Sequence, residues 1–322
     1  MIVAQFDSRL SATVVATREL HYSAGADPAQ DRPGHVRAGS GIARVGDALA
    51  VIQDDTNFIA VVRGDHVRAV PLPPGPGGAR QFGEALGNKV HKLDLEACIL
   101  HQNALIAFGS GSTHERRRVV IVRDLLGASP DVRVVDASAL YARLGAEEAF
   151  AGSELNIEGA AAFGDRLTLF QRGNGSARGL LTPRNATCAL PMNEVWKYLT
   201  AGGPCPRPAD IESYDLGEID GVRLTFTDAA ATAGGRMVFL AAAEDSPDTY
   251  SDGRVVGVAV GVIAGGSARL TRLTSATGAP VLAKTEGIAL RGDDASMADV
   301  VVDKDDADAP CELYSVRMSG FF

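Results

Sequence analysis

A pattern that recurs five times along the 322-residue chain limits the possible folds more than any other feature of the sequence. Each copy has a short apolar segment, a turn rich in Gly, Asp or Asn, a second apolar segment and a polar loop. When the copies are aligned, successive copies are 55 to 66 residues apart. The alignment rests on one position in each copy, namely Gly41, Glu96, Glu158, Asp220 and Glu286.

A repeat of this length, filled by strands of about five residues, is typical of a β-propeller blade with four strands. The fifth copy ends near Met318 one strand short, and the N-terminal segment Ala12 to His21 forms a predicted strand that belongs to no blade. We therefore predict an all-β, five-bladed propeller in which this N-terminal strand completes the last blade and removes the free edges.

The predicted propeller is a single domain that spans residues 1–322. Six blades remain the alternative if residues 1–35 or 176–215 contain a degenerate blade. Helix is expected only at Ala139 to Glu148 and Asn193 to Leu199. The five predicted blades lie near 36–75, 90–138, 155–216, 217–276 and 280–318, with the closing strand at 12–21.

The charge and hydropathy of the chain exclude several classes of partner. A net charge of −9 argues against a nucleic-acid binder, which needs a basic surface. It favours a cationic ligand, a small neutral ligand or a metal ion. The longest apolar run, Val255 to Ala264, is about half of a membrane span, and the N-terminus has no signal-peptide pattern. We expect a cytoplasmic protein that does not contact a membrane.

The repeat predicts that four acidic residues share one face of the propeller. The first two strands of a propeller blade are antiparallel. The start of the innermost strand and the end of the second strand therefore lie on the same face of the propeller. This geometry gathers Glu96, Glu158, Asp220 and Glu286 with five polar loops around the central axis. The five loops are Gln53 to Asp55, Gly109 to Thr113, Gln171 to Gly175, Ala243 to Ser246 and Asp303 to Asp306.

Four carboxylates that point at one axis repel each other, and each pKa rises unless a cation lies between them. Calcium suits such a site because it accepts six to eight oxygen ligands with flexible geometry. Asn156 and Asp303 are candidates for additional ligands. In the alternative interpretation the carboxylates are structural, and they bind backbone amides or pair with Lys92, Arg172, Lys284 or Lys304.

Two further residues are candidates for catalysis on the same face. His114 is the candidate general base, because an imidazole titrates near neutral pH. Arg172 could hold a carboxylate or phosphate of the substrate through two parallel hydrogen bonds. The alternatives are an exposed turn for His114 and a salt bridge between blades for Arg172. Neither a G-x-S-x-G nor an H-E-x-x-H motif occurs.

The stretches NIEGAAAFGDRLTLFQRGNG and KTEGIALRGDDASMADVVVDKDDADAPCELYSV resemble phytase-like and SdiA-regulated propellers. More distantly, the repeated Glu-Gly pair resembles the calcium-dependent propellers of the gluconolactonase, regucalcin and paraoxonase type. In those lactonase-type families such a glutamate can bind the central calcium, which implies this role for Glu158 and Glu286. The first copy departs from the pattern at Gly41, and the second has no glycine after Glu96.

Together these observations predict a metal-dependent hydrolase, with calcium as the expected ion, that acts on a small ester, lactone or phosphoester at the central axis. Two alternatives remain open. One is a non-catalytic propeller that binds a ligand or a partner protein on one face. The other is a lyase or isomerase that uses the same ion. The sequence leaves the substrate undetermined.

Overall fold

The structure of the protein is a computed structural model that describes residues 1–245, 253–292 and 296–322. Antiparallel strands that follow one another along the chain form most of it. The first unit contains β4 (Gly39–Val45), β5 (Ala48–Gln53), β6 (Phe58–Arg63) and β7 (His66–Pro71). The second unit contains β8 (Leu95–His101), β9 (Ala104–Gly109), β10 (Arg118–Arg123) and β11 (Asp131–Asp136).

The third and fourth units repeat this order, and each gains a short strand from the N-terminus in parallel pairing. The third unit contains β12 (Ile157–Phe163), β13 (Arg166–Gln171), β14 (Asn185–Pro191) and β15 (Ala209–Asp215), followed by β1 (Ile2–Val3). The fourth unit contains β17 (Val222–Ala231), β18 (Met237–Asp245), β19 (Arg254–Ala264) and β20 (Ser267–Ser275), with β16 (Glu218–Ile219) beside β17 and β2 (Gln5–Phe6) beside β20.

The N-terminal strand β3 (Ser11–Glu19) lies in the fifth unit, beside the last strand of the chain. It pairs antiparallel with β23 (Glu312–Ser319), and the pairing runs from Glu19 opposite Glu312 to Ser11 opposite Ser319. The other strands of this unit are β21 (Lys284–Arg291) and β22 (Met297–Asp303). Strand β3 also pairs in parallel with β20, which joins the fourth and fifth units into one sheet.

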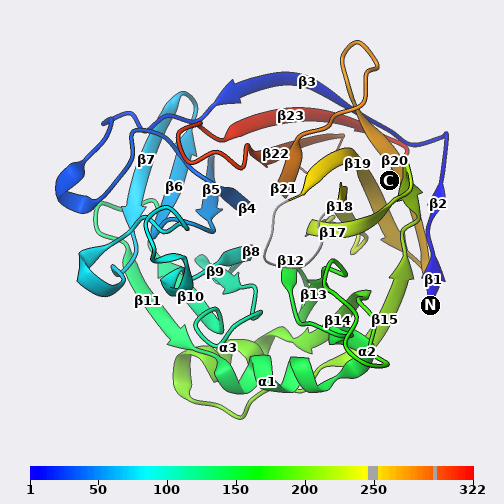
Figure 1. Cartoon of the computed structure of the whole chain (residues 1–322), viewed down its shortest axis with the longest axis horizontal. Helices are drawn as coiled ribbons and strands as arrows, with labels where there is room; N and C mark the ends of the chain where they lie inside the picture. The colour runs from blue at the N-terminus through cyan, green and yellow to red at the C-terminus, as the bar shows by residue number, and fades with distance from the viewer. Residues whose placement is uncertain (246–252, 293–295) are drawn as a thin grey trace.

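The first strands of the five units lie around a common centre (Figure 1). Each of β4, β8, β12, β17 and β21 contacts the first strand of the next unit, and β21 contacts β4 in turn. Most residues of these strands are buried, because the second strand of their own unit and neighbouring units cover them. The fold is therefore all-β and propeller-like, with the N-terminus on its outer edge (Figure 1).

The helices lie on the periphery beside the second and third units (Figure 1). They are α1 (Ser138–Ala146), α2 (Glu148–Ala151) and α3 (Met192–Ala201), and short 3₁₀ turns occur at Pro28–Gln30, Pro76–Gly78 and Lys89–His91. The apolar sides of α1 and α3 close the core between these two units, with Tyr141, Leu144 and Val195 buried there. Both predicted helices are present, but α1 ends at Ala146 because Glu147 leaves the helical conformation (φ −85°, ψ 89°). No helix in the described part of the chain is long and apolar enough to cross a membrane.

Candidate functional site

Each of the five innermost strands contains a β-bulge, which lies near the start of four strands and in the middle of β17. The pairing register shifts by one residue there, so that one extra residue is turned out of the ladder. The bulged residues are Ser40, Glu96, Glu158, Thr227 and Glu286. The bulge is thus the local structure that re-aims these side chains, and it explains the recurrent acidic residue at the head of an apolar strand.

A glycine follows the bulge in three copies, and in the two with a Glu-Gly pair the close approach of the inner strands requires it. A Cβ atom on Gly287 would lie 2.8 Å from the Cα of Gly41 in the first unit. A Cβ atom on Gly159 would lie 3.1 Å from the backbone of Asp228 in the fourth unit. The Glu-Gly pair therefore combines a carboxylate at the bulge with the absence of a side chain where the neighbouring strand passes.

A cavity of about 550 Å³ lies at the ends of the strands that carry these bulges. Four of the bulged residues line it, together with residues from the ends of β5, β13, β18 and β22. A second cavity of about 430 Å³ is lined by later residues of the same inner strands, such as Ala161 and Leu290, and most of its lining residues have uncharged, small or apolar side chains. The charged groups are therefore concentrated at one end of the axis, in what we call the axial cavity.

Most of the predicted site residues line the axial cavity. They are Glu96, Glu158, Glu286, Asn156, Asp303 and Arg172. Four of the five predicted loops contribute as well, through Asp54, Asp55, Asn174, Glu244 and Asp305 among others. Ser246 of the fourth predicted loop lies outside the described residues.

The prediction that Asp220 lies on the same rim is wrong. Asp220 occupies the turn between β16 and β17 with a left-handed backbone (φ 52°), and its side chain is 70% exposed. Its Oδ1 lies 3.8 Å from Nη2 of Arg272. The Asp-Gly turn imitates the repeat in sequence, but the equivalent structural position is Thr227, which is buried and does not line the cavity. In the first unit the equivalent residue is Ser40 rather than Gly41.

His114 does not reach the axial cavity, so the structure gives no support to its predicted role as general base. Its side chain is 67% exposed and its Nδ1 lies 3.9 Å from Oε1 of Glu115. This is the exposed-turn alternative. Neither His114 nor any other histidine or cysteine lines the cavity in the described part of the chain.

Arg172 forms a buried ionic network that joins the third and fourth units. Its Nη1 lies 3.4 Å from Oε2 of Glu158, and its Nη2 donates to Oε2 of Glu244 at the end of β18. Its Nε donates to the Thr225 hydroxyl at 3.2 Å. The other carboxylate oxygen of Glu158 accepts a hydrogen bond of 2.7 Å from Asn156. The inter-blade salt bridge, one of the two alternatives for Arg172, is therefore present.

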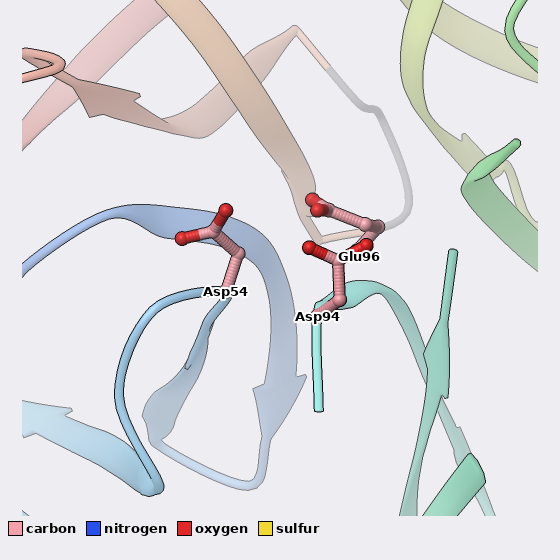
Figure 2. Close-up of side chains that lie close together, drawn as sticks. All are labelled: Asp54, Asp94 and Glu96. Atoms are coloured by element: carbon pink, nitrogen blue, oxygen red, sulfur yellow. The ribbon is translucent and has the colours of Figure 1, made fainter. Parts of the chain in front are cut away.

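A second ionic cluster lies on the side of the first two units and contains Asp54, Asp94 and Glu96 (Figure 2). One carboxylate oxygen from each of these residues lies within 4.8 Å of the other two. The ammonium group of Lys92 is 2.6 Å from both Asp54 Oδ2 and Asp94 Oδ1. The other oxygen of Asp94 pairs with Arg116 at 3.0 Å. Asp94, just before β8, was not predicted, because it lies outside the repeated Glu-Gly position.

Burial raises the pKa values of several carboxyl groups around the cavity, and repulsion by neighbouring carboxylates adds to the effect, whereas Lys92 and Arg116 lower the pKa of Asp94. The pKa of Glu158 rises to about 7, and that of Asp303 rises to about 7. The pKa values of Glu96 and Glu286 lie well above the ordinary range of a glutamate. Burial opposes the charge of Lys92, but attraction by Asp54 and Asp94 outweighs it and raises the pKa of the ammonium group.

Several carboxylate oxygens in the cavity have no partner among the described residues. They are Asp54 Oδ1, Asp55 Oδ1 and Glu286 Oε2. By contrast, carboxylates or hydroxyl groups already engage Arg37, Lys92, Arg116, Arg172 and Lys284. The unused hydrogen-bonding capacity of the cavity is therefore mainly that of acceptors, which favours ligands with hydroxyl, amine or cationic groups.

Residues 35–318 match the model of a protein family described as a family of unknown function (DUF6929). The chain belongs to this family. A comparison with curated proteins finds no significant match. The family therefore brings no established reaction, and the function has to be argued from the site.

The chain is similar to several solved structures. Glutaminyl cyclase from Myxococcus xanthus is 8% identical with a TM-score of 0.50, and the alignment covers 99% of this chain and 98% of that one. A gluconolactonase from Xanthomonas campestris is 12% identical (TM-score 0.41, coverage 96% and 97%). Regucalcin from Agrobacterium tumefaciens, a calcium-binding protein, is 11% identical (TM-score 0.38, coverage 100% and 98%). At 8% identity the likeness to glutaminyl cyclase concerns the fold alone.

The predicted calcium ligands do not all converge. Glu158 and Asn156 bind each other, and Arg172 holds the second oxygen of Glu158. Within the described residues, the group close enough to hold one ion is Asp54, Asp94 and Glu96. A separation of up to 4.8 Å is twice a calcium–oxygen bond of about 2.4 Å, and the donors are the hard oxygens that calcium prefers. These three residues fit a divalent cation, provided that the ammonium group of Lys92 moves away.

Proposed function

We propose that the axial cavity is the active site of a hydrolase for a small polar ester or lactone, at the centre of a closed five-bladed propeller. The observation that carries the proposal is a set of buried carboxyl groups with raised pKa values around one cavity, some with unpartnered oxygens. Active sites are where burial and like charges tune carboxyl groups for proton transfer near neutral pH. The inner strands, which contact one another in a complete cycle, support the closed ring.

Glu286 and Asp303 are the proposed acid and base. They lie on adjacent strands, because Lys284 of β21 is paired with Asp303 of β22, and Lys284 Nζ is 3.8 Å from Glu286 Oε1. Burial raises the pKa of Glu286 well above its ordinary value, which favours the protonated form that an acid needs, whereas the Asp303 pKa of about 7 leaves part of that group ionised at neutral pH. Burial and neighbouring charges can tune two carboxyl groups for opposite roles.

In the proposed reaction the Asp303 carboxylate accepts a proton from water as the water oxygen bonds to the carbonyl carbon. The bond between that carbon and the leaving oxygen then breaks, and Glu286 donates its proton to the leaving oxygen. Arg172 acts as a positioning residue that fixes Glu158, since all its contacts are internal. A phosphoester substrate is disfavoured, because the cations around the cavity are engaged by acidic or hydroxyl groups.

Calcium at Asp54, Asp94 and Glu96 would polarise a substrate carbonyl and lower the pKa of bound water. The proposed proton transfers by Glu286 and Asp303 belong to the chain itself. The predicted cytoplasmic location and the prediction of a small-molecule ligand remain part of this proposal.

A second function is favoured by one observation. Within the described residues the cavity has no cysteine or histidine, and the hydroxyl of its Ser40 donates to the backbone oxygen of Leu95. A non-catalytic propeller that binds a hydroxyl-rich or cationic ligand would need no nucleophile. In that case the unpartnered carboxylate oxygens would serve recognition alone.

A panel of neutral sugar lactones, aliphatic lactones and short-chain esters distinguishes the two functions. We expect the protein to hydrolyse at least one class faster than the buffer does, measured by acid release at pH 7.5, with and without calcium. Sugar phosphates serve as the disfavoured class. An increase in melting temperature with a panel compound that is never hydrolysed would instead support the binding function. Hydrolysis of sugar phosphates alone would contradict the proposed substrate class.

A further inference from the structure

Asp228 occupies a position in β17 at which the other four inner strands carry glycine or alanine. It directly follows the bulge at Thr227. The residues that follow the other bulges are Gly41, Ala97, Gly159 and Gly287. The inner strands approach closely at this level, since a Cβ atom on Gly159 would lie 3.1 Å from the Asp228 backbone. Asp228 is therefore the one residue of these five whose side chain is longer than a methyl group.

These five residues lie between the two cavities along the inner strands. The residues directly before them are the bulged residues, four of which line the axial cavity. The residues directly after them, among them Ala229 and Ile288, line the second cavity. Asp228 is only 2% exposed, so its carboxyl group is shielded from both cavities and its partners belong to the protein.

The carboxyl group of Asp228 binds the inner strand of the fifth unit. Its Oδ2 accepts a buried hydrogen bond of 2.8 Å from the backbone N–H of Ile288 in β21. Strand β21 is the last strand of its sheet, and amides on the free edge of such a strand have no partner in the ladder. Without Asp228 this buried donor would lose its acceptor, which is costly. Ile288 lies two residues after Glu286, the proposed acid.

Backbone amides are the partners of the Asp228 carboxyl group. Burial raises its pKa well above the ordinary range of an aspartate, whereas the amides of Ile288, Ala229 and Ala160 lower it. Asparagine at this position keeps the size of the side chain and an oxygen that accepts a hydrogen bond. Alanine, which the second unit carries at the equivalent position, removes the acceptor.

We propose that Asp228 is a positioning residue for Glu286: its bond to Ile288 fixes the start of β21, and with it the direction in which the bulged Glu286 enters the axial cavity. The direction of a side chain at a bulge depends on the local backbone. A reacting group misplaced by about 1 Å loses a large part of its effect on the rate. The catalytic meaning of this inference rests on the proposed hydrolase, but the placement of Glu286 is measured without any substrate.

Carbon-13 NMR of the Glu286 carboxyl group during a pH titration tests the inference in the wild type, Asp228→Asn and Asp228→Ala, with Glu286→Gln to assign the signal. Both Asp228 variants remove the acidic group, so the difference between them reports the hydrogen bond to Ile288. We expect the Glu286 titration of Asp228→Asn to follow that of the wild type and that of Asp228→Ala to be displaced. With a hydrolysed lactone or ester, kcat should fall about tenfold or more in Asp228→Ala and recover in Asp228→Asn, with KM little changed.

A Glu286 titration that is the same in Asp228→Ala and the wild type would overturn the inference, and so would one displaced equally in both variants. If Asp228→Ala does not fold, Asp228→Ser replaces it, because the serine hydroxyl lies closer to the backbone than the carboxyl oxygens do. If neither folds, Asp228 supports the fold as a whole rather than Glu286, and the inference fails. If the wild type hydrolyses nothing, the proposed function fails, and the NMR comparison alone decides the inference.

Discussion

Replacement of Arg172 by Met is expected to lower the free energy of unfolding by about 3–5 kcal/mol at pH 8. The guanidinium group is 5% exposed and lies between two carboxylates, Glu158 and Glu244, whose side chains are 7% and 5% exposed. Removing it leaves two buried negative charges without their main partner, and methionine restores only the packing. Urea unfolding followed by circular dichroism measures the change.

The loss caused by Arg172→Met should be smaller at pH 5.5 than at pH 8. The pKa of Glu158 is raised to about 7 in the folded protein, so below this pH the group binds a proton and no longer needs the cation. Because the folded state then binds more protons than the unfolded state, this carboxyl group also makes the wild type less stable as pH rises from about 4.5 to 7. The control is Arg178→Met. Arg178 forms an ion pair with Glu154, but its side chain is 68% exposed, so we expect the loss of this pair to lower the free energy of unfolding by less than about 1 kcal/mol. Equal losses in the two variants would contradict the buried network.

Replacement of Gly287 by Ala is expected to destabilise the protein by about 1–3 kcal/mol through overpacking. The added Cβ would lie 2.8 Å from Gly41 Cα and from Ile42 N, which are backbone atoms that cannot rotate away. The fifth and first units would have to separate at the centre. The measurement is the midpoint of thermal or urea unfolding.

Gly83→Ala is the matched control, because no atom lies within 4 Å of the added Cβ and the backbone has no positive φ. We expect this variant to unfold within about 0.5 kcal/mol of the wild type. A Gly287→Ala variant as stable as Gly83→Ala would show that β21 and β4 do not meet as closely as described, and it would remove the main support for a closed ring.

The architecture was predictable from the sequence because strands and turns recur with a regular spacing. The same repeat placed Glu158 and Glu286 at the cavity, since both are followed by the glycine that the close approach of the inner strands requires. The N-terminal strand was predictable for another reason: the last copy of the repeat lacked one strand, and β3 pairs with β23 as expected.

The errors arose where a local signal imitated the repeat. Asp220 precedes a glycine, as Glu158 and Glu286 do, but Asp220 and Gly221 form the turn between β16 and β17. The bulge of this unit lies seven residues later, at Thr227. A bulge leaves no mark in a hydrophobic pattern. Lys92 and Asp94 precede an inner strand, and their contact with Asp54 is a tertiary one that no spacing predicts. The exposed position of His114 likewise depends on how the loop after β9 turns.

The most direct test of the proposed function is the pH dependence of kcat/KM for a hydrolysed lactone or ester, measured for the wild type and three variants. We expect kcat/KM of the wild type to fall below pH 7, because Asp303 must lose its proton to act as base. In Asp303→Asn we expect kcat/KM to be lower than in the wild type by a factor of about 100 or more, and we expect its fall below pH 7 to disappear. In Glu286→Gln we expect kcat/KM to be lower by a similar factor. Asp220→Asn, which changes an acid outside the cavity, should match the wild type. Wild-type rates in both Asp303→Asn and Glu286→Gln would contradict the claim that the axial cavity is the active site.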